Sequence, residues 1–518
     1  MRPPEVPSGR PAPRAAGPGT TAAQARAGFA GTPALGRSYL HLSGGAFASK
    51  LLGALREMLL ARFFGTGAVA DAYRSGLTLT LSPAHFVTGQ IVETCFVPLY
   101  ARYRESDRVR AWALFQGLLL GSIVAGLAVG AVLWVFSGPL VGLLLPGFGP
   151  ERREMTAAML RILALGMPAY LYSALLSALG TAQEDFIIPS LRPGLQNLGM
   201  LVLIPVGALS GHPVWIAWGF TVTYLALAVW GTLLLIARNH FPRAFVFSPA
   251  LFAPLGAALW RLLRPLLPVA VLIQANLILE RSLASLVGPG TVAALDYARF
   301  VTDSTNALLI LPLGLISLAR FSGLDERAAR DEAGGIFALI LLAFAPLSAF
   351  LLVNGRALLA LLFLRGAYDV RSLDGSARAL AGLSAGLWAF SACQVLRRVL
   401  NARLCNGRVL AAEGLGVALN AGFNLLLYRR LGILALGLGP SVGALGSLIL
   451  YGRGLALGAE AKARLRLLAW TLPPYAAAAF ALSRAARGLP GLGLQSLFAA
   501  LYWGYWIGVR GRRIRGAQ

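Results

Sequence analysis

Charged residues are scarce in this chain. Asp, Glu, Lys and Arg make up 13% of its 518 residues, whereas a soluble domain usually has about 25%. Hydrophobic residues make up 57%, and the mean hydropathy is +0.69. Apolar segments of about 20 residues recur along nearly the whole length, and each can cross a hydrocarbon core of about 30 Å. The composition therefore excludes a soluble globular domain and predicts an all-α, polytopic membrane protein.

Cysteine is also rare, and its spacing excludes two kinds of site. The three cysteines are Cys95, Cys393 and Cys405, and none has a CxxC partner or a nearby pair of histidines. A disulfide framework and a structural metal site are therefore not expected. No cofactor or metal is predicted.

Lysine occurs only at Lys50 and Lys462, so arginine supplies almost all of the net charge of +25. The arginines are spread over short loops between apolar spans and form no single patch. This distribution argues against nucleic-acid binding and fits the positive-inside rule for membrane proteins.

Catalytic motifs are absent as well. The sequence has no P-loop, no HExxH and no GxSxG elbow. A membrane-embedded enzyme such as a polyprenyl-phosphate glycosyltransferase would need an acidic, metal-binding loop, and none is evident. We therefore expect that the protein is not an enzyme.

About fourteen membrane spans are predicted from length and hydropathy. Residues 1–37 are rich in Pro, Gly, Ala and Arg without an apolar core, which predicts a disordered cytoplasmic tail or an over-long start. SGPLVGLLLPGF (137–148) and NGRALLALLFLRGAY (354–368) are similar amphipathic runs that end in a glycine turn, six spans apart. This echo predicts an N-terminal lobe at 38–240 (spans 1–6), a C-terminal lobe at 241–455 (spans 7–12), and two extra helices with a basic tail at 456–518. The predicted spans are 41–63, 74–100, 111–136, 156–181, 187–210, 214–237, 262–286, 293–318, 333–353, 378–402, 409–428, 431–451, 466–484 and 489–509.

Loop charge predicts the orientation. With the N-terminus inside, arginines are roughly twice as frequent in inside segments as in outside segments. Both termini are therefore expected in the cytoplasm. The inside arginines include Arg102, Arg104, Arg108, Arg110, Arg238, Arg243, Arg512 and Arg513.

The first span carries charges in its middle. At about 100° per residue, small and charged residues share one stripe of this helix, and Phe47, Leu51 and Leu55 lie on the other side. A charge that faces lipid costs roughly 2.5–3.5 kcal/mol even on a lenient scale. The stripe is therefore expected to face a bundle interior or a watery cavity with an anionic cargo. Its residues are Ser43, Ala46, Ser49, Lys50, Gly53, Arg56 and Glu57.

Other spans also carry polar residues at buried depth. The second span has Asp71, Arg74, His85, Gln90 and Glu93, and the seventh has Gln274, Asn276, Glu280 and Arg281. In the eighth span Asp296, Arg299 and Asp303 lie within about 80° of arc. Asp296 and Asp303, at i−3 and i+4, could equally neutralise Arg299 in a purely structural arrangement. A cavity lined with Arg and Lys suits phosphate or pyrophosphate, which arginine binds bidentately.

Several sequence pieces, in this order, resemble the MurJ/MviN family of lipid II flippases within the multidrug/oligosaccharidyl-lipid/polysaccharide exporter superfamily. They are SKLLGALREMLLARFFGTGAVADAY, FVPLYARY, SGPLVGLLLPGF, LRILALGMPAYLYSALLSALGTAQEDFIIPSLRPGLQNLGML, LLFLRGAY and LALGLGPSVGALGSLILY.

The resemblance implies a protein that moves lipid-linked peptidoglycan precursor from the inner to the outer leaflet of the bacterial cytoplasmic (inner) membrane. It implies alternating access between two lobes, with a groove for the lipid tail at the last two helices. Lys50 falls where the family has a basic residue, and Arg56 and Asp71 match its functional arginine and aspartate. The chain departs from the family late in its second span, where Ala84 and His85 replace arginine and Gly89–Gln90 replaces a glutamate–glycine pair. In its eighth span Phe300 replaces an arginine beside Arg299.

The hypothesis from the sequence is a flippase for lipid II, needed for cell-wall synthesis. Its expected partners are a polyprenyl pyrophosphate glycan, membrane lipids and cell-wall synthesis proteins, and a monomer is expected. Another polyprenyl-linked polysaccharide or a drug remains an alternative cargo. A non-transporting cell-wall scaffold is a further alternative, in which Lys50, Arg56 and Asp71 can be neutralised without effect. In the flippase, Lys50, Arg56 and Arg299 would bind substrate, and gating ion pairs would involve Glu57, Asp71, Arg74, Glu93, Asp296 and Asp303.

Overall fold

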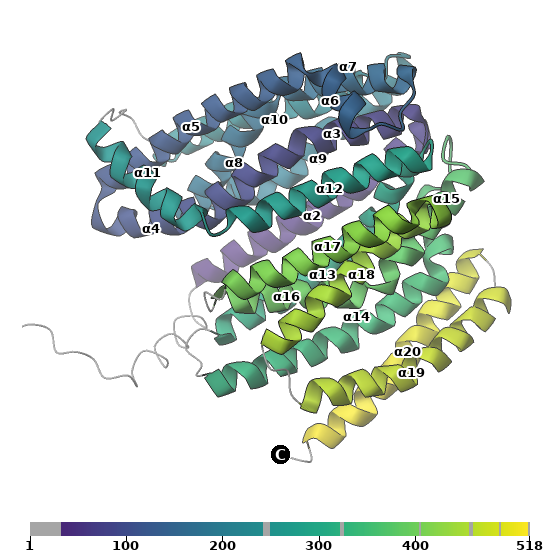
Figure 1. Cartoon of the computed structure of the whole chain (residues 1–518). Helices are drawn as coiled ribbons and strands as arrows, with labels where there is room; N and C mark the ends of the chain where they lie inside the picture. The colour runs from purple at the N-terminus through teal and green to yellow at the C-terminus, as the bar shows by residue number, and fades with distance from the viewer. Residues whose placement is uncertain are drawn as a thin grey trace, which may run out of the picture.

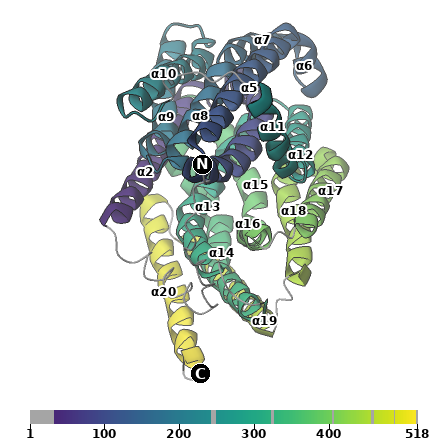
Figure 2. The ribbon, with the colours of Figure 1, turned by 90° about the vertical axis from the view of Figure 1, so that its left-hand side faces the viewer.

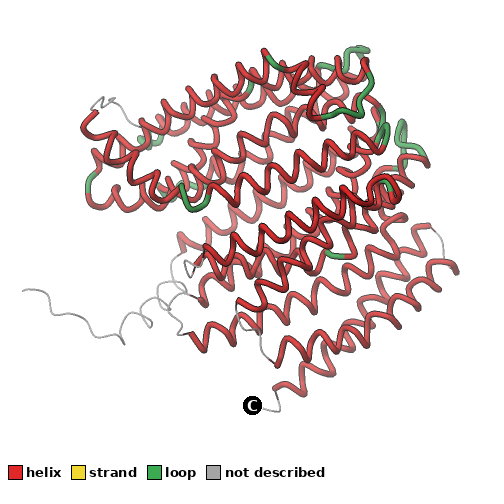
Figure 3. The backbone as a smooth tube through the Cα atoms, in the orientation of Figure 1, coloured by secondary structure: helices red, strands yellow, loops and turns green. Residues whose placement is uncertain are grey.

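The computed structural model describes residues 33–241, 249–321, 326–402, 406–454, 459–485 and 488–515. Every regular element in these ranges is a helix (Figure 3). The all-α prediction is confirmed. The helices are α2 (Pro33–Phe64), α3 (Ala68–His85), the π-helix η1 (Phe86–Phe96), α4 (Val97–Ser106), α5 (Arg108–Val135), α6 (Ser137–Leu144), α7 (Pro150–Leu165), α8 (Met167–Ala182), α9 (Ile187–Leu209), α10 (Trp215–Ala237), α11 (Pro249–Leu263), α12 (Leu267–Val287), α13 (Thr291–Phe321), α14 (Glu326–Phe363), α15 (Val370–Ala385), α16 (Leu387–Ala402), α17 (Asn406–Leu431), α18 (Ile433–Gly454), α19 (Ala459–Ala485) and α20 (Gly488–Arg515).

Each predicted span coincides with one helix or with consecutive helices. Seven helices in the described part are long and apolar enough to cross a membrane, and two bent pairs also pass this test when each pair is taken together. The pairs are α7 with α8, bent by 46°, and α15 with α16, bent by 51°. In α2 the charged residues Lys50, Arg56 and Glu57 lower the hydropathy of the helix, and the burial of Glu57 and the partial burial of Arg56 need a separate explanation.

Helix α5 shows why the bundle needs a bilayer. It begins at the Asp107 side chain, which accepts hydrogen bonds from the backbone N–H groups of Val109 and Arg110. Further along, Val124 and Leu127 are 56% and 58% exposed. A stripe of large apolar side chains is costly in water but is favourable against lipid tails. The protein is therefore a multi-pass membrane protein.

The helices pack into two groups (Figures 1 and 2). In the first group, α2–α10, helix α2 packs on α9, α3 on α7, and α5 on α8. In the second group, α12–α18, helix α12 packs on α17, and α15 packs on α13, α14 and α18. Helices α19 and α20 pack against α14, whereas α11 packs on α5 and η1 of the first group. The lobe boundaries expected from the sequence stay a prediction.

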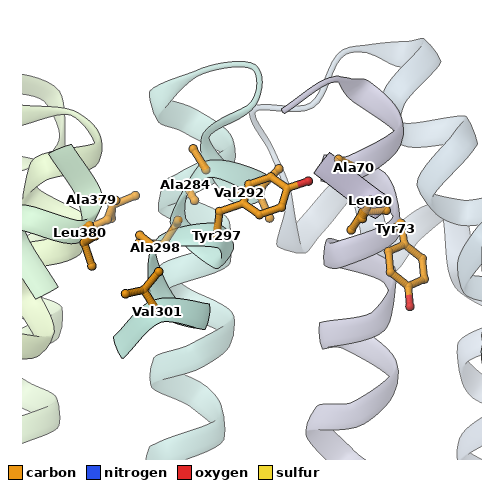
Figure 4. Close-up of a cluster of buried hydrophobic side chains, with 14 of the residues drawn as sticks. Leu60, Ala70, Tyr73, Ala284, Val292, Tyr297, Ala298, Val301, Ala379 and Leu380 are labelled. Atoms are coloured by element: carbon orange, nitrogen blue, oxygen red, sulfur yellow. The ribbon is translucent and has the colours of Figure 1, made fainter. Parts of the chain in front are cut away.

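A continuous apolar core joins the two groups. Small residues there let the helices approach closely. Figure 4 shows side chains of both groups in this core: Leu60, Ala70 and Tyr73 belong to α2 and α3, and Ala284, Val292, Tyr297, Ala298, Val301, Ala379 and Leu380 belong to α12, α13 and α15.

The two similar segments, residues 137–148 and 354–368, differ in structure. Residues 137–148 form the separate helix α6 and a turn, because the chain breaks between α5 and α6 at Phe136. Residues 354–363 instead continue α14 without interruption, and only the glycine turn that follows resembles its counterpart. The expectation of two separate amphipathic runs was therefore wrong for the second, where the helix continues through Asn354 and Gly355 although both are typical turn residues.

Candidate functional site

A chain of buried ion pairs crosses from the first group to the second. Glu57 of α2 is only 4% exposed and accepts hydrogen bonds from Arg56 at 2.6 Å and from Arg74 of α3 at 2.5 Å. A second guanidinium nitrogen of Arg74 lies 3.4 Å from Asp296 of α13. Asp296 also accepts a hydrogen bond of 2.5 Å from Arg281 of α12. Four helices are thereby joined through charged side chains.

The chain of ion pairs explains how α2 tolerates its charges inside the membrane. Burying one unpaired ion costs several kcal/mol, and the cost is offset only when partners complete its hydrogen bonds. The five residues of the chain carry three positive and two negative charges. Arg74 additionally stacks on Tyr297, with its Cζ 4.3 Å from the ring centroid. The chain therefore keeps one uncompensated positive charge.

A cavity of about 200 Å³ lies against this chain of ion pairs. Arg56 borders it from α2, and its side chain is 23% exposed. The second nitrogen of its guanidinium donates to the amide oxygen of Asn197 in α9 at 2.9 Å. Arg56 is thus held at both ends of its guanidinium while one side of it stays accessible. The other polar residues that line this cavity are Glu57, Tyr73, Arg74, Thr78, Ser82, His85, Arg281 and Asp296.

A larger cavity, of about 610 Å³, lies among α12, α13 and α15–α18. Glu280 and Arg299 line it and form an ion pair with each other. Arg299 therefore pairs with a residue of α12, and not with Asp296 or Asp303 of its own helix. The sequence could not show this partner, because the spacing within α13 places both Asp296 and Asp303 near Arg299.

Asp71 makes its contacts at one end of the bundle, away from Arg56. The carboxylate is fully buried and accepts hydrogen bonds from the backbone N–H groups of Gly290 and Ala293, at 2.7 and 2.9 Å. Gly290 directly precedes α13 and Ala293 lies in its first turn, where the helix dipole favours a negative charge. Arg152 of α7 adds an ion pair at 3.4 Å. Asp71 therefore joins the two groups as an N-terminal cap supplied by another helix.

Two glycine turns close the same end of the bundle, and we call this end the closed end. Gly366, in the turn after α14, lies so close to the end of α2 that a Cβ would be 2.2 Å from the carbonyl oxygen of Arg62. Gly147, in the turn after α6, would place a Cβ 2.0 Å from the carbonyl oxygen of Ser285 in α12. Each glycine turn thus contacts the end of the other group's first long helix. The similarity between residues 137–148 and 354–368 therefore corresponds to equivalent contacts in the structure.

Hydrogen bonds between the groups surround these turns. The N–H of Ala367 donates to the carbonyl of Arg62 at 2.8 Å, and the hydroxyl of Tyr297 donates to the carbonyl of Gly65 at 3.0 Å. Gly65 itself has a φ of +53°. The closed end is therefore built largely from backbone contacts that tolerate no side chain at Gly65, Gly147 and Gly366.

Three predicted site residues are not joined to this arrangement. Lys50 and Asp303 are exposed on α2 and α13, and neither forms an ion pair with a residue of the described ranges, although Asp303 lines the larger cavity together with Arg299. Glu93 belongs to η1, but its side chain lies outside the described residues. Their predicted roles stay predictions.

Sequence reasoning singled out Glu280 and Arg281 as polar but assigned them no role. The sequence did contain a sign of their role, because the first long helix of each group has an adjacent acidic and basic residue. These pairs are Arg56–Glu57 before Gly65 and Glu280–Arg281 before Gly288. Arg152 and Asn197 were missed. Arg152 stands in the first turn of α7, where an arginine is most simply read as a solvated loop residue, and the contact of Asn197 with Arg56 depends on the packing of α9 on α2.

Comparisons with known proteins agree with the resemblance predicted from the sequence. The family model described as "Lipid II flippase MurJ" matches residues 60–484. A "Probable lipid II flippase MurJ" of Rhizobium meliloti (strain 1021) is 25% identical over 419 residues, which is 76% of this chain and 76% of the relative.

Solved structures share the fold. "Lipid II flippase MurJ, inward closed conformation" superposes with a TM-score of 0.80 at 15% identity, over 91% of this chain and 99% of that one. An inward-facing multidrug resistance MATE family transporter of the MOP superfamily gives a TM-score of 0.59 at 13% identity, over 81% and 96%. The bundle therefore corresponds better to the first fold than to the second.

Proposed function

The chain belongs to the lipid II flippase MurJ family, and we propose that it moves lipid II across the bacterial cytoplasmic membrane for cell-wall synthesis. The observation that carries the proposal is the cavity beside the buried chain of ion pairs, where Arg56 is half-buried, fixed by Glu57 and Asn197, and still accessible. A guanidinium held in this way is prepared for a phosphate oxygen, because little conformational entropy is lost on binding.

The proposed transport cycle uses the two groups as lobes, 38–240 and 241–455, that alternate around the cavity. Both termini are cytoplasmic in this proposal, so α2 runs outward and the closed end faces away from the cytoplasm. The contacts of Asp71 and of the glycine turns keep that end shut while substrate enters from the inner leaflet. Opening requires these contacts to separate and others to form at the opposite end.

Pyrophosphate has a direct effect on the ion pairs in this scheme. One phosphate oxygen replaces the carboxylate of Glu57 on Arg56, and Glu57 keeps its bond to Arg74. The positive charge that the ion pairs leave uncompensated favours the anion. Lys50, exposed six residues before Arg56, and Arg299 beside the larger cavity are proposed to contact the rest of the head group. Binding then changes the charge balance at the junction of α2, α3, α12 and α13, where the lobes meet.

The test is binding of the purified protein to lipid II and to the same lipid without its pyrophosphate. We expect binding that depends on pyrophosphate and is lost in Arg56→Ala. Arg110→Ala is the matched control, because Arg110 is exposed, pairs only with Asp107 of the described residues, and lies outside the cavity. Binding that ignores the pyrophosphate would favour a drug exporter, and no binding with full cellular function of Arg56→Ala would favour a scaffold.

A further inference from the structure

The larger cavity, of about 610 Å³, has one charged side chain without a partner. Among the charged residues that line it, Arg299 pairs with Glu280, and Arg397 lies 3.7 Å from Glu413. Asp303 also lines the cavity, is exposed, and forms no ion pair within the described ranges. Two positive and three negative side chains therefore give the described lining of this cavity a net charge of −1.

The two cavities carry opposite charges and lie next to each other at α12. Leu277 borders both of them, Glu280 lines the larger one, and the next residue, Arg281, lines the smaller one. The smaller cavity has the uncompensated positive charge of the buried chain of ion pairs, whereas the larger one has the free carboxylate of Asp303. A cargo molecule that contacts both cavities is therefore complementary if it has an anionic group in the first and a cationic group in the second.

Asn306 adds a neutral hydrogen-bond donor one helical turn away from Asp303. It stands three residues later on α13, lines the same cavity and is only 8% exposed. Its Oδ1 accepts a hydrogen bond of 2.5 Å from the hydroxyl of Ser391 in α16, but its Nδ2 is buried and has no partner in the described part of the chain. Native proteins leave few buried amide groups unpaired, so a bound carbonyl oxygen would complete the hydrogen bonds of Asn306.

The remaining polar side chains of the larger cavity are amides and hydroxyls, which can both donate to and accept from a peptide backbone. A volume of about 610 Å³ is within the usual range for a ligand pocket. A glycan would leave the carboxylate of Asp303 without a cation, whereas a peptide with a side-chain amine supplies both a cation and carbonyl oxygens. These side chains are Asn276, Thr302, Gln394, Asn420, Ser441 and Ser447.

We propose that the larger cavity binds the peptide of a lipid-linked peptidoglycan precursor, with Asp303 paired to an ammonium group of that peptide and Asn306 donating to one of its carbonyl oxygens. The inference rests on the proposed function and deepens it, because it names the part of the cargo that the second group recognises. The pyrophosphate beside Arg56 and the peptide beside Asp303 belong to one molecule. The cargo thus contacts both groups, which are the lobes that alternate in the proposed cycle.

The experiment compares the binding of three forms of lipid II to the full-length protein in lipid nanodiscs. The first form has a free side-chain amine on its peptide, in the second this amine is acetylated, and in the third it is dimethylated. Acetylation removes the positive charge, whereas dimethylation adds similar bulk and keeps the charge. We expect acetylation to weaken binding about 5- to 20-fold, as for a charge-assisted hydrogen bond that is partly exposed to water, and dimethylation to weaken it less than about twofold.

Asp303→Asn tests the partner of the amine. This variant should bind the free-amine form about as weakly as the unaltered protein binds the acetylated form, and acetylation should then cause no further loss. Glu154→Gln is the matched control, because Glu154 is exposed on α7 and lines neither cavity. Asn306→Ala should weaken the binding of all three forms alike, since it removes a donor to the peptide backbone and leaves the partner of the amine in place.

A structural or ion-binding role of Asp303 gives a different result. If acetylation weakens binding to Asp303→Asn as much as to the unaltered protein, or leaves the affinity of the unaltered protein unchanged, the peptide subsite is overturned. Unchanged affinities in Asn306→Ala overturn the carbonyl contact. If the unaltered protein binds none of the three forms, the proposed function fails together with the subsite, whereas pyrophosphate-dependent binding that ignores the amine refutes the subsite alone.

Discussion

Replacing Asp71 by asparagine should open the closed end of the bundle. The substitution keeps the size of the side chain and removes its charge. Asparagine retains one acceptor oxygen, so one of the two N–H groups of Gly290 and Ala293 would face an NH₂ group. The ion pair with Arg152 would also be lost.

The magnitude follows from these contacts. A hydrogen bond to a charged group contributes about 1.5–3 kcal/mol. A carboxylate at a buried helix N-terminus adds up to about 1 kcal/mol or slightly more. The closed end would therefore lose about 2–4 kcal/mol, which shifts the equilibrium between closed and open forms roughly 30- to 700-fold.

The assay is a distance distribution between spin labels on the two groups. Leu143 of α6 and Val370 of α15 are 75% and 56% exposed. Cysteines introduced at these positions can be labelled selectively once Cys405 is changed to serine, because Cys95 and Cys393 are buried. The unaltered protein should give one short distance, and Asp71→Asn should add a longer one.

Asp185→Asn is the control for this measurement. Asp185 also caps a helix, accepting from the N–H of Ile187, and pairs with Arg238, but all of these residues belong to the first group. It should lower thermal stability without changing the distances. If Asp71→Asn behaves in the same way as Asp185→Asn, Asp71 does not hold the two groups together and the reasoning is refuted.

Two further substitutions test the closed end and the buried chain of ion pairs. Gly65→Ala should shift the same spin-label distances, because its Cβ would be 2.2 Å from the carbonyl oxygen of Ala367. The control is Gly211→Ala, which has a φ of +70° in open space and should cost only the backbone strain of about 1–2 kcal/mol. Equal effects of the two substitutions would contradict the close-contact argument. Glu57→Gln should destabilise the purified protein by about 3–5 kcal/mol in denaturation measurements, because Arg74 loses its closest partner. Adding Arg74→Gln should recover part of that loss, and strict additivity would show that the pair is not coupled.

The membrane class and the helix positions could be predicted from the sequence because hydropathy is a property of each segment by itself. The stripe of α2 was also predictable, since helical periodicity alone decides it. Ser49, Gly53 and Glu57 are buried, as predicted, and Phe47 and Leu51 are 64% and 57% exposed. Lys50 lies at the edge of this stripe and stays exposed.

The partners of the charges could not be predicted, because they depend on packing between distant segments. Asp71 contacts residues more than 200 positions away, and its spacing within α3 gives no hint of the start of α13. Arg299 pairs across to α12 instead of within α13.

The most direct measurement of the central claim is translocation of lipid II in liposomes that contain only this protein. Labelled lipid II placed in one leaflet should become accessible to an enzyme on the other side, and Arg56→Ala should abolish this while inserting and folding normally. Translocation by Arg56→Ala at the rate of the unaltered protein would contradict the account, since the accessible guanidinium beside the buried chain of ion pairs would then have no part in transport.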